Sequence, residues 1–134
     1  MMRRSLEDMA HRELVRKLDA EFSKWVRTMA SIEGTCQCVT CKKRKPAKHM
    51  DAGHYISRRH MATRWNEMNV WPQCKQCNGF GGGEPQAYRE FLVEHYSEEE
   101  VLELEQKRHT VVQWTKDELI QAINDYRSKL KALT

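Results

Sequence analysis

Two C-x-x-C pairs constrain this chain more than any other feature of its sequence. Cys38 and Cys41 form the first pair, and Cys74 and Cys77 form the second. Each pair can hold one ion through a tight turn, and four thiolates complete a tetrahedral zinc site. Such a site has no free position for a substrate, so we expect a structural Zn²⁺ whose binding stabilises the fold. Cys36 is left outside the site because only one residue separates it from Cys38.

The cysteine count and the composition set further limits. Five cysteines in a chain with no secretion signal favour metal binding over a disulfide framework, a redox pair or free buried thiols. The 134 residues are 40% hydrophobic and 31% charged, which suits one compact domain with a modest core. No apolar run approaches a membrane span of about 18 residues. We therefore expect a cytoplasmic protein with no membrane partner.

Positive charge is concentrated in the first part of the chain. Residues 1–83 contain 16 Lys and Arg against 8 Asp and Glu, whereas residues 84–134 contain 7 against 11. The basic residues that gather around the cysteines and histidines are Lys42, Lys43, Arg44, Lys45, Lys48, Arg58, Arg59 and Arg64. Phosphate is the partner that such a cluster favours, and an ordinary solvated surface is the alternative.

Hydrophobic periodicity divides the chain into three segments. Residues 1–34 predict an amphipathic helix that starts with an N-cap at Ser5 and stops near Gly34. Its apolar stripe is long for so small a core, so we expect it to pack on the C-terminal helices or on a second copy of the chain. Residues 35–83 lack helical periodicity, and residues 84–134 return to helix and are expected to pack on the core. The helix starts in this last segment are marked by Pro85, Ser97 and Thr115.

The central segment is expected to combine strands with a helical turn. Extended structure is predicted around Met50–Ile56 and Asn69–Gln73, with a basic loop between the two strands. A turn of helix is predicted at Lys75–Phe80, and a glycine-rich stretch then breaks the chain. The predicted fold is therefore α+β, with a small zinc-stapled core flanked by a long N-terminal helix and C-terminal helices.

Three polar residues of the central segment stand in a recognisable order. His54 is followed by Asn69 fifteen residues later and by Asn78 nine residues after that, interleaved with the C-x-x-C pairs. This order resembles the HNH endonuclease motif in its H-N-N variant. Within that group, the runs AGHYISR and PQCKQCN are similar to the phage lambda NinG (Rap) family of recombination nucleases. The similarity covers about residues 36–92.

The resemblance implies a ββα-metal core and phosphodiester hydrolysis, which needs a base, a cation and a scaffold for both. It implies that His54 is the general base and that Asn69 ties down the loop that orients His54. It also implies that Asn78 coordinates a single Mg²⁺ or Mn²⁺ through its amide oxygen. The implied substrate is phage or prophage DNA in branched, Holliday-type recombination intermediates, inside a bacterial host cell.

Gly53 departs from the family pattern, because many HNH enzymes place a metal-binding Asp or His immediately before the base. Asp51 is the nearest carboxylate and is assigned as the second ligand of the catalytic ion. In an extended strand the side chains of Asp51 and His54 point to opposite faces, so a bulge would be required. An alternative makes His54 the metal ligand and His60 or His49 the base.

Basic side chains near this constellation are the predicted DNA contacts, through paired hydrogen bonds to phosphates. The residues assigned to this role are Arg58, Arg59, Arg64, Lys75 and Arg89. The long apolar stripe, and the need to cut two strands of a symmetric junction, also predict a homodimer.

Two functions other than a nuclease are compatible with the same sequence. A non-catalytic zinc-stabilised DNA-binding module would use the same cysteines and basic loop, whereas an interaction adaptor would use the long helices. His54 and Asn78 discriminate between these functions, because a binding module needs neither of them.

Overall fold

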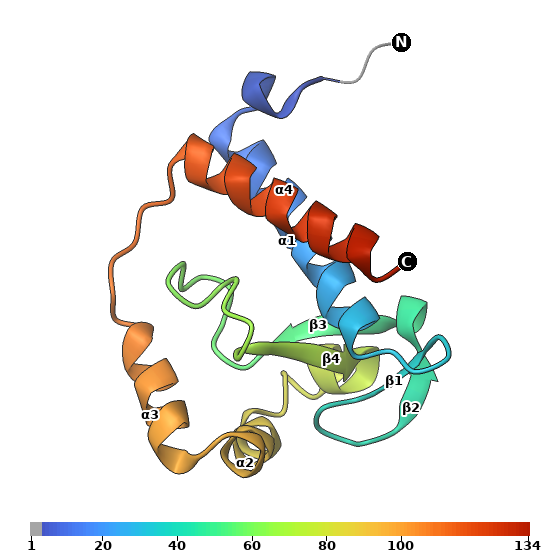
Figure 1. The fold of residues 1–134 in the computed structure, drawn as a ribbon. Coiled ribbons are helices and arrows are strands. Elements are labelled where there is room, and N and C mark those ends of the chain that lie inside the picture. The colour runs from blue at the N-terminus through green and yellow to red at the C-terminus, as the bar shows by residue number, and fades with distance from the viewer. Residues whose placement is uncertain (1–3) are drawn as a thin grey trace.

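The computed structural model describes residues 4–134 and shows a mixed α+β chain (Figure 1). Residues 1–3 of the predicted N-terminal segment lie outside the described residues. The elements are η1 (Leu6–Asp8), α1 (His11–Met29), β1 (Thr35–Gln37), β2 (Arg44–Pro46), η2 (Ala47–His49), β3 (Met50–His54), β4 (Val70–Cys74), η3 (Gln76–Phe80), α2 (Pro85–His95), α3 (Glu98–Lys107) and α4 (Lys116–Ala132). The β3–β4 hairpin lies between the α1–α4 pair and the α2–α3 pair (Figure 1).

Helix α1 buries one apolar face against α4 and the β3–β4 hairpin. The buried residues of this face are Leu14, Leu18, Phe22 and Val26. They share a core with Leu119, Ile123 and Tyr126 of α4. The predicted apolar stripe is therefore covered within the chain, and it no longer gives a reason to expect a second copy.

Ser5 is the N-cap residue of a helix, as predicted, but the prediction that the long helix runs from it is wrong. The 3₁₀ turn η1 comes first, and Ser5 Oγ donates to Asp8 Oδ2 (2.8 Å) instead of accepting a backbone N–H. Helix α1 begins only at His11. The break lies at Met9, whose extended backbone lets its side chain join the core between α1 and α4. The chain therefore buries the Met9 side chain in the core and does not form one continuous helix from Ser5 to Met29.

Two antiparallel hairpins form the centre of the chain. The β1–β2 hairpin was not expected from the sequence, and it follows a turn in which Gly34 has a φ of 80°. The β3–β4 hairpin matches the two predicted strands closely. Its register runs without interruption from the Met50–Cys74 pair to the His54–Val70 pair. The predicted helical turn follows as η3.

The C-terminal helices begin where their sequence signals predict. Pro85 is the first residue of α2. Ser97 Oγ accepts the N–H of Glu100 (3.1 Å), and Thr115 Oγ1 accepts the N–H of Glu118 (3.1 Å). These hydrogen bonds satisfy amides that have no partner within the helix, and so they define where α3 and α4 start.

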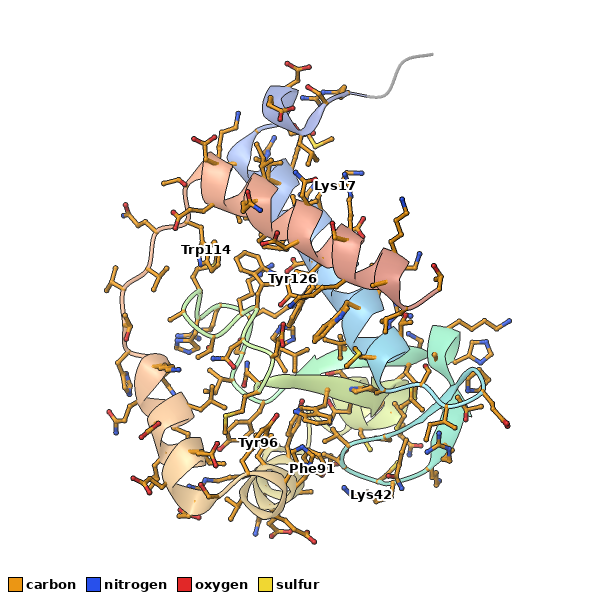
Figure 2. The ribbon with its side chains drawn as sticks, in the orientation of Figure 1. Lys17, Lys42, Phe91, Tyr96, Trp114 and Tyr126 are labelled. Atoms are coloured by element: carbon orange, nitrogen blue, oxygen red, sulfur yellow. The ribbon has the colours of Figure 1, made fainter. Side chains whose placement is uncertain are left out.

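Aromatic side chains from both helix pairs pack toward the hairpin. Figure 2 shows Phe91 and Tyr96 on the side of α2, and Trp114 and Tyr126 on the side of α4. The core on the α2–α3 side contains Val39, Ile56, Tyr88, Leu92, Val101 and Leu104. The hairpin is thus held on both faces, which fixes the side chains that project from it. Among the described helices, none combines the length and apolar character needed to cross a membrane.

Candidate active site and metal centre

Four cysteine sulfurs converge beside the β3–β4 hairpin. Cys38 and Cys41 lie in the β1–β2 connection, Cys74 ends β4, and Cys77 lies in η3. Their Sγ atoms all lie within 4.8 Å of one another, and Cys41 Sγ is 3.8 Å from Cys74 Sγ. Four sulfurs each about 2.3 Å from one zinc ion stand about 3.8 Å apart. The spacing therefore fits a single metal ion such as zinc.

Backbone amides donate to two of these sulfurs. Cys74 N–H donates to Cys38 Sγ (3.3 Å), and Cys77 N–H donates to Cys74 Sγ (3.4 Å). Burial raises the pKa of Cys38, but hydrogen bonds to its sulfur, led by that of Cys74 N–H, outweigh burial and lower the pKa to about 6. Cys38 is thus prepared to ionise, as a metal ligand must. Cys36 is buried in β1 and lies outside the group of four.

A pocket of ≈ 670 Å³ opens next to the cysteine cluster. It is lined by α1, β3, the loop after β3, the start of η3 and the glycine-rich loop that follows. The predicted site residues that line it are Asp51, His54, Arg58, Lys75 and Asn78. The structure therefore brings together the predicted base, both predicted ligands of the catalytic ion and two of the predicted DNA contacts. His49 and His60, the alternative bases, are not part of its lining.

His54 ends β3 and is half-buried in this pocket. Its Nε2 lies 2.8 Å from the carbonyl oxygen of Arg64. A carbonyl only accepts hydrogen bonds, so Nε2 carries the proton of the neutral ring and Nδ1 is the nitrogen with the lone pair. Burial lowers the pKa of His54, which favours the neutral imidazole. The ring is therefore oriented and in the protonation state that a general base requires.

Asn69 does not line the pocket but fixes the loop that holds His54. Its side chain is fully buried. Oδ1 accepts the N–H of Ile56 (2.8 Å), while Nδ2 donates to the carbonyls of Ile56 (3.0 Å) and Thr63 (3.1 Å). Thr63 immediately precedes Arg64, whose carbonyl contacts His54. Asn69 thus makes the contacts that its predicted role requires.

Asp51 is clasped by two hydrogen-bond donors. Lys75 Nζ contacts Asp51 Oδ1 at 2.7 Å, and Asn78 Nδ2 donates to Asp51 Oδ2 at 3.0 Å. Burial raises the pKa of the carboxyl, but the hydrogen bonds from Lys75 and then Asn78 outweigh it, so the pKa lies below its usual value. An ionised carboxylate beside an amide is a suitable donor set for a hard divalent cation.

The expectation that a bulge must bring Asp51 and His54 together is wrong. The register of β3 is regular, and both side chains still line the same pocket. The sheet contains only β3 and β4, so no other strand pairs with the outer edge of β3. A pocket along that edge can receive side chains from both faces of the strand. Gly53, between them, has its carbonyl oxygen hydrogen-bonded by Tyr88 Oη (2.7 Å).

Three of the predicted DNA contacts are paired with carboxylates, and one of them, Lys75 beside Asp51, keeps a side chain that is 68% exposed. Arg64 forms an ion pair with Asp19 and donates to the Arg58 carbonyl, and its side chain is only 17% exposed. Arg89 pairs with Glu98 and Glu105 of α3, and it lies outside the pocket lining. Both guanidiniums therefore already have carboxylate partners, and their predicted contacts with phosphates stay predictions.

Arg59 is exposed and also lies outside the pocket lining.

Sequence reasoning missed three charged residues that line the pocket. Asp19 and Arg27 come from α1, and Lys48 comes from η2. Asp19 accepts hydrogen bonds from Arg64 and from Trp65 Nε1 (2.9 Å), so it braces the loop that follows β3. Asp19 directly follows Leu18 of the apolar face of the first helix, and an acidic side chain at that place is a signal that it has a partner elsewhere in the fold. Lys48 was noted only as part of the basic cluster, and nothing in the helical pattern singled out Arg27.

A family model and individual relatives both relate this chain to phage ninG proteins. A family model described as Bacteriophage Lambda NinG protein matches residues 2–134. The chain is 34% identical to protein ninG of Escherichia phage lambda over 97 residues and 34% identical to that of Salmonella phage P22 over 99 residues. Each alignment covers 72% of this chain and 47% of the relative, so the chain spans about half the length of the curated relatives it matches. No solved structure matches the chain.

Proposed function

The chain belongs to the phage NinG family, and we propose that it is a metal-dependent endonuclease that hydrolyses phosphodiester bonds in DNA. The observation that carries the proposal is the meeting of His54, Asp51 and Asn78 in one pocket. Hydrolysis of a phosphodiester needs a base, a cation site and positive charge around the phosphate. The same pocket is lined by the basic side chains of Arg27, Lys48, Arg58 and Lys75.

His54 is the general base in this proposal. The Arg64 carbonyl holds its Nε2–H, so Nδ1 is the nitrogen that accepts the proton of the attacking water. Because burial lowers the pKa of His54, the ring is neutral at a pH of about 7 and can take that proton. Asn69 contributes indirectly by fixing the loop that carries this carbonyl.

Asp51 and Asn78 are the residues that would hold the catalytic Mg²⁺ or Mn²⁺. Both offer oxygen atoms, which these ions prefer. When bound, the ion supplies positive charge that offsets the charge developing on the phosphate. The low pKa of Asp51 keeps its carboxylate ionised. Asn78 now presents Nδ2 to Asp51, so its amide must turn to present Oδ1 to a cation.

The four cysteines have a separate role in the proposal, as ligands of a structural Zn²⁺. Cys74 and Cys77 flank Lys75, and Asn78 follows directly. A closed metal site at this point would fix the start of η3 relative to β3. The zinc would therefore hold Asn78 beside Asp51 without contacting the substrate.

Branched recombination intermediates of phage or prophage DNA, in a bacterial host, are the proposed substrates. This part of the proposal rests on family membership and on the basic pocket lining, because contacts to phosphates read the shape of DNA rather than its sequence. Cutting both strands of a symmetric junction needs two active sites, so we propose that the protein acts as a homodimer. Light scattering of the protein mixed with a four-way junction tests the dimer, and one protomer per junction contradicts it.

Cleavage of a DNA panel tests the nuclease proposal. Linear, flapped and four-way DNA are incubated with the zinc-loaded protein and Mg²⁺ or Mn²⁺, and products are separated on a sequencing gel. We expect cation-dependent cutting, strongest on branched DNA. His54→Ala should abolish cutting while zinc content, folding and DNA binding stay unchanged. His60→Ala is the matched control, because His60 lies outside the pocket lining, and it should cut like the wild type.

The same experiment separates the nuclease from a zinc-stabilised DNA-binding module. Binding without cutting by the wild type, at every cation tested, would favour the binding module. Undiminished cutting by His54→Ala would show that the base has been assigned to the wrong residue.

A further inference from the structure

Gln73 carries a buried acceptor that has no partner. Its side chain is fully buried on β4. The amide nitrogen donates to Thr40 Oγ1 (3.2 Å) and to the carbonyl of Gly83 (2.8 Å), but Oε1 accepts no hydrogen bond. Within residues 4–134, only Trp114 has another buried side-chain polar atom of this kind. Such atoms are rare in folded proteins because they cost free energy, and one reason to retain them is a bound ion or water.

The unpaired oxygen lies where a side chain of residue 53 would lie. Gln73 is the register partner of Asp51, so the two side chains project from the same face of the hairpin. A Cβ placed on Gly53 would lie 2.2 Å from Gln73 Oε1 and 2.7 Å from Gln73 Cβ. Gln73 and a side chain at position 53 therefore exclude each other. Gln73 is not itself part of the pocket lining, but its amide nitrogen holds Gly83, which lines the pocket together with Asp51.

Resting on the proposed function, we propose that Gln73 Oε1 is a further oxygen donor to the catalytic divalent cation, beside Asp51 and Asn78. The amide oxygen would take the place of the acid that Gly53 lacks. Mg²⁺ and Mn²⁺ accept neutral amide oxygens as well as carboxylates. This assignment gives the unpaired buried oxygen a partner and places it where the glycine before His54 leaves space.

Binding of Mn²⁺ to the zinc-loaded full chain, without DNA, tests the assignment by isothermal titration. Gln73→Met removes the oxygen from a side chain of similar length and should weaken Mn²⁺ binding by about tenfold. Gln73→Glu keeps an oxygen and adds a charge, so it should bind Mn²⁺ at least as tightly as the wild type. Thr40→Val removes a partner of the amide nitrogen and a contact with Cys38 Sγ, but no partner of Oε1, so Mn²⁺ affinity should stay within about twofold of the wild type if zinc content is unchanged. Zinc content is measured for each variant.

The two Gln73 variants separate a ligand from a merely structural residue. Equal weakening of Mn²⁺ binding in Gln73→Met and Gln73→Glu would overturn the assignment, because both lose the amide nitrogen and only one loses the oxygen. Wild-type affinity in Gln73→Met would also overturn it. If Gln73→Met fails to fold, Gln73→Glu decides alone, since weaker binding there contradicts the proposal and equal or tighter binding supports it.

Asp51→Asn distinguishes failure of this inference from failure of the proposed function. If Asp51→Asn weakens Mn²⁺ binding and the Gln73 variants behave like the wild type, the cation site stands and only the role of Gln73 is wrong. If the wild type binds no Mn²⁺, or Asp51→Asn has no effect, the cation site of the proposed function fails and the assignment of Gln73 fails with it.

Discussion

The four-cysteine cluster and the His54 pocket meet at η3, where Cys77 and Asn78 are neighbours in the chain. In the cluster, four sulfurs lie within 4.8 Å of one another, and two of them accept backbone N–H groups. In the pocket, polar side chains surround a space of ≈ 670 Å³, and His54 is held by one contact to a loop carbonyl. One region is closed and suited to stability, whereas the other is open and suited to chemistry. Substitutions should therefore separate folding from cutting.

The largest effect is expected from removing one ligand of the cluster. Cys74→Ser, or extraction of the metal with a chelator, should unfold the chain at ordinary temperature. Binding of a structural zinc contributes about 10–16 kcal/mol in small domains, which equals or exceeds a typical domain stability of about 5–15 kcal/mol. Circular dichroism and zinc content measure the loss. Cys36→Ala is the matched control, since Cys36 is equally buried but lies outside the cluster, and it should fold with zinc bound.

A melting temperature unchanged by the chelator would contradict the structural role of the cluster, because the chain would then fold without a metal ion.

Asn69→Ala should affect both regions. It leaves buried backbone groups of Ile56 and Thr63 without partners, which costs about 1–3 kcal/mol for each group. We expect a loss of about 3 kcal/mol in the free energy of unfolding, and a fall in cleavage rate because the loop that holds His54 loosens. Urea unfolding and single-turnover cleavage measure the two effects. Asn66→Ala, which removes a contact to Met68 N–H in the same loop, should change both much less.

Slower cleavage by Asn69→Ala without any loss of stability would place Asn69 in the chemistry itself and contradict a purely positioning role.

The pH profile of cleavage should report the burial of His54. Burial lowers the pKa of His54 below the usual value of about 6.5, so the neutral base persists to lower pH than a free imidazole. Cleavage at fixed Mg²⁺ should therefore fall less between a pH of about 7 and about 6 than it would for a base with the usual pKa of about 6.5. A rate that halves above a pH of about 7 would contradict a lowered pKa in the free enzyme.

The free energy of unfolding should also decrease as the pH falls, for the same reason. The unfolded chain binds a proton at His54 more readily than the folded chain, so the stability from neutral His54 is complete above the unfolded pKa of about 6.5. That stability is lost as the pH falls through the lowered folded pKa. Urea unfolding of the wild type and His54→Ala over this range measures it, and parallel curves would contradict the linkage.

The smallest effects are expected when basic residues are replaced and DNA affinity is measured. Arg58→Met should weaken DNA binding several-fold and reduce the salt dependence by about one counterion, because Arg58 lines the pocket. Arg89→Met should leave DNA affinity unchanged, because Arg89 is paired with Glu98 and Glu105. Fluorescence anisotropy at several salt concentrations compares the two. Equal losses would show that the DNA path extends over α2.

Sequence reasoning succeeded where neighbouring residues carry the information. The C-x-x-C spacing predicted the four-cysteine group, and the caps at Ser97 and Thr115 predicted the starts of α3 and α4. Both signals are local, since a turn or a cap needs only residues within one helical turn. The prediction of one long helix from Ser5 was wrong, because the chain is extended at Met9, whose side chain packs in the core with α1 and α4. A contact with the far end of the chain is not visible in a local pattern.

The order of His54, Asn69 and Asn78, the two cysteine pairs and the flanking helices can all be predicted from the amino-acid pattern. Folding is needed to show that Asp51 and His54 line one pocket and that carboxylates pair with Arg64 and Arg89. The difference arises from distance along the chain. Spacing within a motif sets local geometry, whereas strand edges and ion pairs depend on segments that meet only after folding.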